Sequence, residues 1–191
     1  MTAVKLLAVS GSVRDGSFNQ RLLDRASAVA SEAGAEVTRI RLADLNLPLY
    51  TPALEAAGMP ERALHLKSLF QANDGFLIAT PEHNGSVSAI LKNAIDWVSR
   101  PTDGETALAL SAFRGKIAGL MSASPSPFGG LRSVTHLRQI LATVQVLTAT
   151  EQVIVPFADS AFEGDELVAP IPNQLLPILV SRVMALCRAS S

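Results

Sequence analysis

The sequence predicts an α/β domain in which helices cover both faces of one parallel, five-stranded sheet. Short apolar runs of strand length alternate along the chain with longer segments of helical periodicity, which is typical of β-α-β units. Hydrophobic residues make up 48% of the chain and charged residues 17%, enough apolar side chains for a full-sized core. No repeat, low-complexity tract or linker divides the 191 residues. We therefore expect residues 1–191 to form a single domain.

The expected strands differ in how deeply they are buried. Residues 4–9 form a near-continuous apolar run, as in a strand covered on both faces. Residues 36–42 (EVTRIRL) alternate between apolar and polar side chains, which predicts a less buried strand. The third and fourth strands are expected at residues 75–79 and 116–121. The fifth lies within residues 145–157, in one or two pieces.

Helical spacing of apolar residues predicts a helix after each strand. The expected helices cover residues 19–33, 60–72, 87–99, 131–144 and 175–188. Pro60 and Pro177 fall in the first turns of their helices, where proline fits. The proline-rich residues 44–60 are expected to be an irregular loop. The apolar residues of helix 87–99 recur at helical spacing and form one stripe that faces the sheet: Val87, Ile90, Leu91, Ala94, Ile95 and Val98. Trp97 falls at the edge of this stripe, and it lies either in the core or at a subunit contact.

For five strands in this alternation, the leading arrangement is the flavodoxin-like order 2-1-3-4-5, a three-layer α/β/α sandwich. Ligands of such sheets lie beyond the carboxyl ends of the strands, at the switch point between the first and third strands. Polar, glycine-bearing loops follow three strands there: SGSVRDGSFNQ (10–20), TPEHNGS (80–86) and SASPSPFGG (122–130). Their convergence on one edge of the sheet predicts a ligand site.

The loop at residues 10–20 offers anion donors without matching a nucleotide motif. Ser17 stands where a P-loop needs lysine, and Val13 occupies the second glycine of the dinucleotide fingerprint. Its hydroxyls, the Arg14 guanidinium and the N–H groups at a helix start suit a terminal phosphate. The alternative is an ordinary strand-to-helix turn in which Ser17 and Gln20 form a capping box, which leaves Arg14 and Ser12 without a role.

The stretch GSVRDGSFN, followed by PEHNGSVSAILKNAIDW, resembles the NADPH-dependent FMN reductase family, which includes flavodoxin-like quinone, chromate and azo-dye reductases. The resemblance covers nearly the whole chain. It implies that the FMN phosphate is held by Ser12, Arg14, Ser17 and Asn19. It implies that the isoalloxazine ring is lined, largely through backbone groups, by Pro81, Glu82, His83, Asn84 and Gly85. It also implies that the opposite side of the flavin site is closed by Ser122, Ser124, Gly129 and Gly130.

The same resemblance implies an enzyme: hydride passes from NADPH or NADH to bound FMN, and then to a quinone or similar small-molecule acceptor, in ping-pong order. The flavin carries this chemistry, so no catalytic side chain is expected. Glu82 is the carboxylate placed to serve as a general base, although hydride transfer needs none. The chain departs from the family where His83 replaces a common tyrosine, and where Ser88-Ala89 replaces a proline-glycine pair. The family also favours a homodimer or homotetramer.

A flavodoxin-type electron carrier, or a flavin-binding regulatory module that does not oxidise NAD(P)H, is the alternative. Such carriers usually present a strongly acidic face, which the net charge of −1 does not suggest. The same charge predicts no nucleic-acid partner. A serine hydrolase would need the G-x-S-x-G elbow, which is absent around Ser12 and Ser86.

The remaining expectations concern location and the less common residue types. No apolar run approaches the length of a membrane span and no signal-peptide core is recognisable, so we expect a cytoplasmic protein without a membrane span. The single cysteine, Cys187, excludes an internal disulfide and is expected to be buried and inert. No cluster of metal ligands is predicted. His65 and His136 fall on predicted helices, without partners at a ligating spacing.

Overall fold

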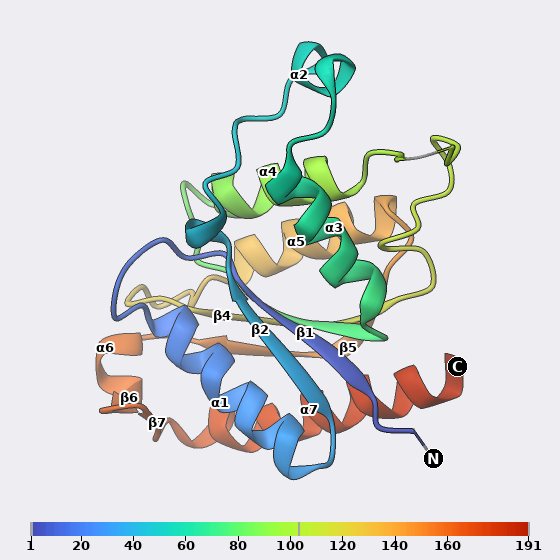
Figure 1. Ribbon diagram of the computed structural model, residues 1–191. Helices are drawn as coiled ribbons and strands as arrows, with labels where there is room; N and C mark the ends of the chain where they lie inside the picture. Colours follow the sequence, from blue (N-terminus) through green and yellow to red (C-terminus); the bar gives the residue numbers. More distant parts are fainter. Residues whose placement is uncertain (1, 103, 191) are drawn as a thin grey trace.

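The computed structural model describes residues 2–102 and 104–190. Its main sheet is parallel and has the predicted order, β2-β1-β3-β4-β5 (Figure 1). The strands are β1 (Lys5–Ser10), β2 (Glu36–Arg41), β3 (Gly75–Ala79), β4 (Ile117–Ala123) and β5 (Leu147–Val155). The three inner strands are almost wholly buried, whereas the edge strands β2 and β5 are partly exposed. The predicted fold class is therefore confirmed.

Helices cover both faces of the sheet (Figure 1). On one face lie α1 (Phe18–Glu32) and α7 (Pro170–Ser190), whose apolar side chains form one core cluster with the sheet. On the other face lie α3 (Glu61–Ala72), α4 (Ala89–Val98) and α5 (Leu131–Thr143), which form a second cluster. Each inner strand thus has an apolar layer on both sides, which explains its continuous apolar sequence.

Helix α4 faces the sheet as its spacing predicts, with Leu91, Ala94, Ile95 and Val98 buried. Trp97 is fully buried as well. Its indole Nε1 donates a hydrogen bond of 2.7 Å to the carbonyl of Pro48, in the connection after β2. Of the two roles considered for Trp97, packing within the chain is the one that the structure supports.

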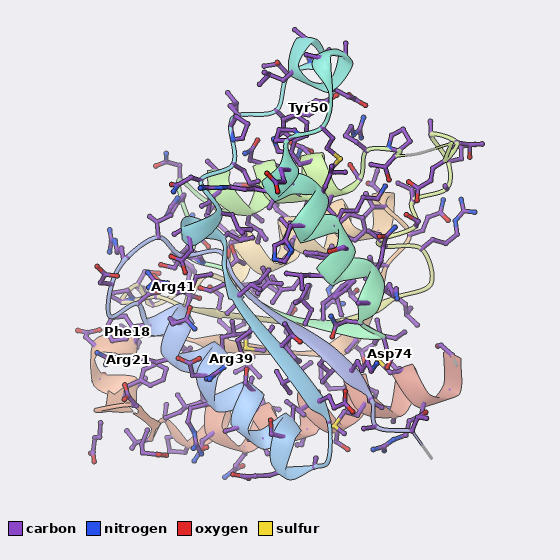
Figure 2. All side chains as sticks on the ribbon, in the orientation of Figure 1. Phe18, Arg21, Arg39, Arg41, Tyr50 and Asp74 are labelled. Carbon is purple, nitrogen blue, oxygen red and sulfur yellow. The ribbon has the colours of Figure 1, made fainter. Side chains whose placement is uncertain are left out.

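The connection between β2 and α3 is more regular than predicted. Residues 44–60 were expected to form a loop, but a 3₁₀ turn covers Leu42–Leu45 and helix α2 covers Pro52–Ala57. The high proline content is misleading here, because Pro52 occupies the first turn of α2, where its missing N–H is not needed. None of the residues of α2 is buried, and the helix projects from the body (Figure 1). Tyr50 lies at its base (Figure 2).

The last helix also differs from the prediction. It begins at Pro170, five residues before the expected start, so Pro177 lies inside the helix and not in its first turn. Packing explains why the helix tolerates this proline: Leu176, Leu179 and Val183 are all buried in the core. A short helix and a two-stranded hairpin that were not predicted precede it: α6 (Ala158–Ala161), β6 (Phe162–Glu163) and β7 (Glu166–Leu167).

Helix α7 comes closer to the length of a membrane span than the sequence suggested. By length and composition it is the one helix of the described residues that could cross a membrane. Its contacts are those of a core helix, however, because it packs on β5, β4 and α1. Its buried residues belong to the same cluster as the side chains of the sheet.

The strand register brings the starts of three loops together. Ser10 pairs with Ala79, which pairs with Met121. Beyond the strands, Gly11 N donates to the carbonyl of Ala79 (2.9 Å) and Thr80 N donates to the carbonyl of Met121 (3.1 Å). The loops after β1, β3 and β4 therefore leave the sheet side by side, as the predicted topology requires.

A buried ion pair gives the fold a testable pH dependence. The Lys67 side chain is 3% exposed and its ammonium binds Glu105 together with the carbonyl of Arg100 (2.8 Å) and the hydroxyl of Thr102 (2.9 Å). The hydrogen bond from Lys67 lowers the pKa of Glu105 to about 2. Because this pKa is depressed on folding, the stabilisation is present above the usual range of the carboxyl and is lost as pH falls toward 2.

We predict that Glu105→Gln lowers the free energy of unfolding at pH 7 by about 1–3 kcal/mol, since it weakens a charged hydrogen bond to a buried ammonium. The variant should also show a smaller loss of stability between about pH 4.5 and pH 2 than the parent chain. Urea unfolding at several pH values measures both effects. Parallel stability curves for the two proteins over this range would contradict the assignment.

Candidate functional site

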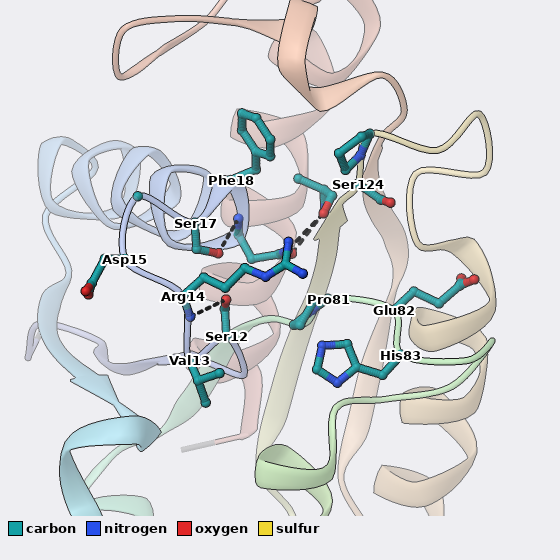
Figure 3. A pocket seen from close by; sticks show the side chains of 14 residues that line it. Ser12, Val13, Arg14, Asp15, Ser17, Phe18, Pro81, Glu82, His83 and Ser124 are labelled. Atoms are coloured by element: carbon teal, nitrogen blue, oxygen red, sulfur yellow. Dashed lines mark hydrogen bonds between the residues drawn. The ribbon is translucent and has the colours of Figure 1, made fainter.

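A cavity of about 570 Å³ opens at the carboxyl ends of the inner strands (Figure 3). Its wall is built by the loops after β1, β3 and β4, which are the three loops that the sequence predicts to converge. The lining residues are Ser12, Val13, Arg14, Asp15, Gly16, Ser17, Phe18, Asn19, Pro81, Glu82, His83, Ala123, Ser124 and Pro125.

The loop after β1 presents backbone donors to this cavity. Two serine hydroxyls shape it: the Ser10 Oγ accepts from Ser12 N, and the Ser12 Oγ accepts from Arg14 N, each at 3.3 Å. Within residues 2–102 and 104–190, no hydrogen bond involves the N–H groups of five lining residues: Val13, Asp15, Gly16, Ser17 and Phe18. Unpaired N–H groups at the start of a helix are characteristic of an anion site.

Arg14 adds a positive charge to these donors. Figure 3 shows its side chain reaching from the loop across the cavity, toward Pro81 and Ser124. Ser17 is the N-cap of α1, and its side chain accepts from Asn19 N at 3.2 Å. The predicted capping box is only half formed, because the Gln20 amide binds Asp24 instead of the N-cap backbone. The capping and phosphate-binding interpretations of this loop are thus compatible.

Asn19 has a structural role beside its place in the cavity wall. Its Nδ2 donates to the carbonyl of Ala123 (2.8 Å), and its Oδ1 accepts from Ala123 N (2.9 Å). Asn19 is 3% exposed, so these two bonds join the start of α1 to the end of β4 in a dry environment. One amide side chain therefore fixes the distance between two walls of the cavity.

The loop after β3 contains a tight turn. His83 and Ser86 exchange two backbone hydrogen bonds, of 2.9 and 3.0 Å, around Asn84 and Gly85. Both central residues have positive φ, 50° and 78°, a conformation for which Asn-Gly is the favoured pair. Asn84 and Gly85 shape the turn and do not line the cavity. The imidazole of His83 points into the cavity, whereas the Glu82 carboxylate points away from it (Figure 3).

The Glu82 carboxylate is bound by one residue of α5. It accepts from the Arg132 backbone N–H (3.1 Å) and from its Nε (2.7 Å), and it pairs with a terminal nitrogen of the same guanidinium. The Glu82 side chain is 7% exposed. This arrangement argues against the general-base role considered for Glu82, because the carboxylate is occupied and turned away from the cavity.

The loop after β4 closes against its own strand. Ser122 is fully buried and donates to the carbonyl of Thr80 at 2.6 Å. Gly130 approaches it so closely that a Cβ at position 130 would lie 1.9 Å from the Ser122 Oγ. Gly129 is similarly confined against the Pro156 backbone. Ser122, Gly129 and Gly130 therefore hold the loop in place, and none of them lines the cavity, whereas Ser124 does.

The structure thus brings eight of the thirteen predicted site residues to the cavity: Ser12, Arg14, Ser17, Asn19, Pro81, Glu82, His83 and Ser124. It also adds residues that the sequence reasoning missed. Phe18 is the most informative of these, since its ring stacks on Phe162 at 5.8 Å and gives the cavity an aromatic wall. The sequence signal was available, because Phe18 stands between two predicted phosphate residues.

Ser88, one of the two departures from the family pattern, has a clear contact. It is fully buried, and its Oγ donates at 2.6 Å to the carbonyl of Gly11, at the start of the loop after β1. This hydroxyl does not cap α4, although it occupies the N-cap position. It joins the start of α4 to the loop after β1, a role that the sequence alone did not reveal.

The other residues considered from the sequence lie outside the cavity. His136, which the sequence places on a helix without a partner at a ligating spacing, has its Nδ1 3.0 Å from the Ser86 Oγ. Cys187 is buried, and burial raises the pKa of its thiol to about 11, which fits the expected inert role. No group of His, Cys, Asp or Glu within the described parts of the chain has the arrangement of a metal site.

Together, the sheet order and the position of the cavity, at the carboxyl ends of the inner strands, define a flavodoxin-like protein. The profile of the NADPH-dependent FMN reductase family matches residues 4–160. An NAD(P)H-dependent FMN reductase of Pseudomonas aeruginosa is 36% identical over 163 residues, which cover 84% of this chain and 82% of the relative. The chain therefore belongs to the NADPH-dependent FMN reductase family, and it is an oxidoreductase that uses FMN and NAD(P)H.

Two further similarities agree with this assignment. A 2-hydroxy-1,4-benzoquinone reductase of a Burkholderia species is 35% identical over 145 residues, covering 76% of this chain and 74% of the relative. The structure of FerB, a flavoenzyme NAD(P)H:(acceptor) oxidoreductase from Paracoccus denitrificans, superposes with a TM-score of 0.81 over 98% of both chains. Its sequence is 24% identical, so this likeness concerns the fold.

We predict that Ser88→Ala lowers the free energy of unfolding by about 1–3 kcal/mol, because it leaves the Gly11 carbonyl without its buried donor. It should also weaken FMN binding, since the loop after β1, which lines the cavity, loses its hydrogen bond to α4. Ser27→Ala is a matched control. That buried hydroxyl donates to the carbonyl of Leu23 within α1, and its loss should cost less than about 1 kcal/mol. Urea unfolding and fluorescence titration with FMN make the comparison, and equal effects of the two changes would contradict the role of Ser88.

Proposed function

We propose that the cavity is the FMN site, with the phosphate in the loop of residues 12–18. The observation that carries this proposal is the set of five unpaired N–H groups in that loop, beside the Arg14 guanidinium. A dianionic phosphate would give partners to these donors and would gain from the positive end of α1. Ser12 and Ser17 would add hydroxyl contacts at the same place.

The ring would then lie against the turn after β3. The N–H group of Glu82, which lines the cavity, takes part in no hydrogen bond of the described residues, so it is available to the polar edge of a flavin. Pro81, His83 and Ser124 would line the remaining wall. Asn84 and Gly85 would act through the turn they form, and Ser122, Gly129 and Gly130 by holding the loop after β4. This retains all thirteen predicted residues, with five of them supporting the site from outside the cavity.

When bound, FMN supplies the two-electron chemistry by which hydride leaves NAD(P)H and reaches an acceptor. The chain's own residues would bind and orient the cofactor: the loop of residues 12–18 would hold its phosphate, and the turn after β3 would support its ring. No side chain of the cavity needs to move a proton for hydride transfer. We propose ping-pong kinetics, in which NAD(P)H and a quinone or similar acceptor would use the same place on the flavin in turn.

The wider assignments rest on this function. We propose that residues 1–191 act as one FMN-binding domain, because β1 and α7, near the two ends of the chain, share one core cluster. We propose a homodimer or homotetramer in the cytoplasm, where NAD(P)H is available. The exposed side chains of Leu49 and Leu54, on and beside the projecting helix α2, support subunit contact. Sedimentation analysis tests the assembly.

The phosphate assignment predicts a ligand-selective effect. Arg14→Ala should raise the Kd for FMN about 10- to 100-fold, as expected for the loss of a charged hydrogen bond. The same change should leave the Kd for riboflavin nearly unchanged, since riboflavin has the same ring and no phosphate. Fluorescence titration measures both constants. An equal loss of affinity for the two ligands would contradict the assignment of Arg14 to the phosphate.

The enzymatic function predicts that the FMN-loaded protein loses its visible flavin absorbance rapidly when NADPH or NADH is added without oxygen. Addition of a quinone should then restore the absorbance, and initial rates at several quinone concentrations should give parallel reciprocal lines. Bound flavin that stays oxidised with both coenzymes would indicate a carrier or a regulatory module instead. Intersecting lines would contradict the ping-pong order.

A further inference from the structure

Helix α5 begins without a cap of its own, and the loop after β3 supplies one. The N-cap position of α5 is Gly130, which has no side chain, and the N–H of Arg132 in the first turn is unpaired within the helix. The Glu82 carboxylate, fifty residues away in sequence, accepts that N–H. A carboxylate at a helix start is stabilised by the partial positive charge there. Glu82, in the loop after β3 that lines the cavity, thus caps the N-terminus of α5.

A second contact joins the same two segments one helical turn further on. The Ser86 Oγ lies 3.0 Å from the Nδ1 of His136, which is four residues after Arg132 on α5. Between the two contacts, the Arg132 side chain runs under Gly85, where a Cβ would lie 3.8 Å from its Nε. Arg132 also places its guanidinium 5.1 Å from the centre of the Phe128 ring. The turn therefore rests on Arg132 as well as being bonded to it.

Glu82 brings this ion pair to the cavity wall against which the flavin ring is proposed to lie, with its own side chain 7% exposed. Glu82 lines the cavity, and its carboxylate extends from the cavity wall toward α5 (Figure 3). Transfer of a hydride from NAD(P)H brings two electrons and one proton to the ring and adds one unit of negative charge to it. An unpaired carboxylate on this wall would oppose that charge, and an unpaired guanidinium would favour it. As long as both are present, the two effects nearly cancel.

We propose that Arg132 and Glu82 are a positioning pair that sets the reduction potential of the flavin. Arg132 offsets the charge of the carboxylate that fixes the turn, so the turn is anchored without penalising the reduced ring. This inference rests on the proposed placement of FMN and goes beyond it, because neither side chain is proposed to touch the reacting atoms. The pair acts through its charges and through the position of the turn.

The test is the two-electron reduction potential of the FMN-loaded protein, measured by equilibration with a reference dye. Arg132→Gln leaves an unpaired carboxylate and should lower the equilibrium constant for reduction about three- to tenfold, a shift of about 15–30 mV. Glu82→Gln leaves an unpaired guanidinium and should raise the potential by a similar amount. Both variants retain an acceptor for the Arg132 backbone N–H, so the cap of α5 is kept in each.

Two further variants, Glu82→Gln/Arg132→Gln and Arg132→Lys, separate the effect of charge on the potential from the effect of side-chain shape. The double glutamine variant should return close to the parent potential, and Arg132→Lys should remain near it because the charge is conserved. Arg182→Gln is a matched control, since it breaks an Arg–Glu pair (2.8 Å to Glu151) that lines a different surface groove, and it should shift nothing. Opposite shifts of the two single variants support the inference, whereas shifts in the same direction, or none, overturn it.

The outcome is distinguishable from failure of the proposed site. If Arg14→Ala weakens FMN and riboflavin equally, the placement of FMN is wrong and the potentials of the pair lose their interpretation. If Arg14→Ala is selective for FMN but the two single variants move together, the placement stands and only the electrostatic role of Arg132 and Glu82 is overturned.

Discussion

The parallel register of β1, β3 and β4 is the constraint on which the rest of the molecule depends. Because Ser10 pairs with Ala79 and Ala79 pairs with Met121 on neighbouring strands, the loops after the three strands leave the sheet at the same edge. The polar groups of these loops are far apart in sequence, and no local propensity would gather them. The two apolar layers that bury the inner strands hold this register, so the core determines where the site lies.

The loops are then fixed by a few buried polar side chains. Asn19 joins the loop after β1 to β4, Ser88 joins that loop to α4, and Glu82 joins the turn after β3 to α5. Each of these contacts gives a hydrogen bond to a backbone group that would otherwise be unpaired. Breaking the contact would therefore cost free energy, which stabilises the observed position of each loop. Among the described residues, the N–H groups of Val13, Asp15, Gly16, Ser17 and Phe18 have no such partner. The contrast between satisfied supports and unsatisfied donors favours a ligand at this place.

Periodicity in the sequence is enough to predict the architecture, whereas features that depend on distant contacts escape sequence-based prediction. Strand order, layers and the three converging loops are read from apolar patterns and turn residues. Helix α2 was missed because Pro52 and the prolines on either side of the helix suggest a loop. The early start of α7 was missed because burial of its side chains outweighs the proline within it. At the site, Arg14 and Ser17 line the cavity, and their contact with the FMN phosphate stays a prediction. The supporting roles of Gly130 and Ser88 depend on partners about eight and seventy-seven residues away, which no local pattern reveals.

The most direct measurement of the central claim is a comparison of backbone amide shifts by NMR during titration with FMN and with riboflavin. We predict that FMN shifts the amides of residues 12–18 and of residues 82–85, because the phosphate would contact the first loop and the ring the second. Riboflavin should shift the amides of residues 82–85 strongly and those of residues 12–18 only weakly. If FMN leaves the amide shifts of both loops unchanged, or mainly shifts amides on the surface between β5 and α7, this placement of the site is wrong.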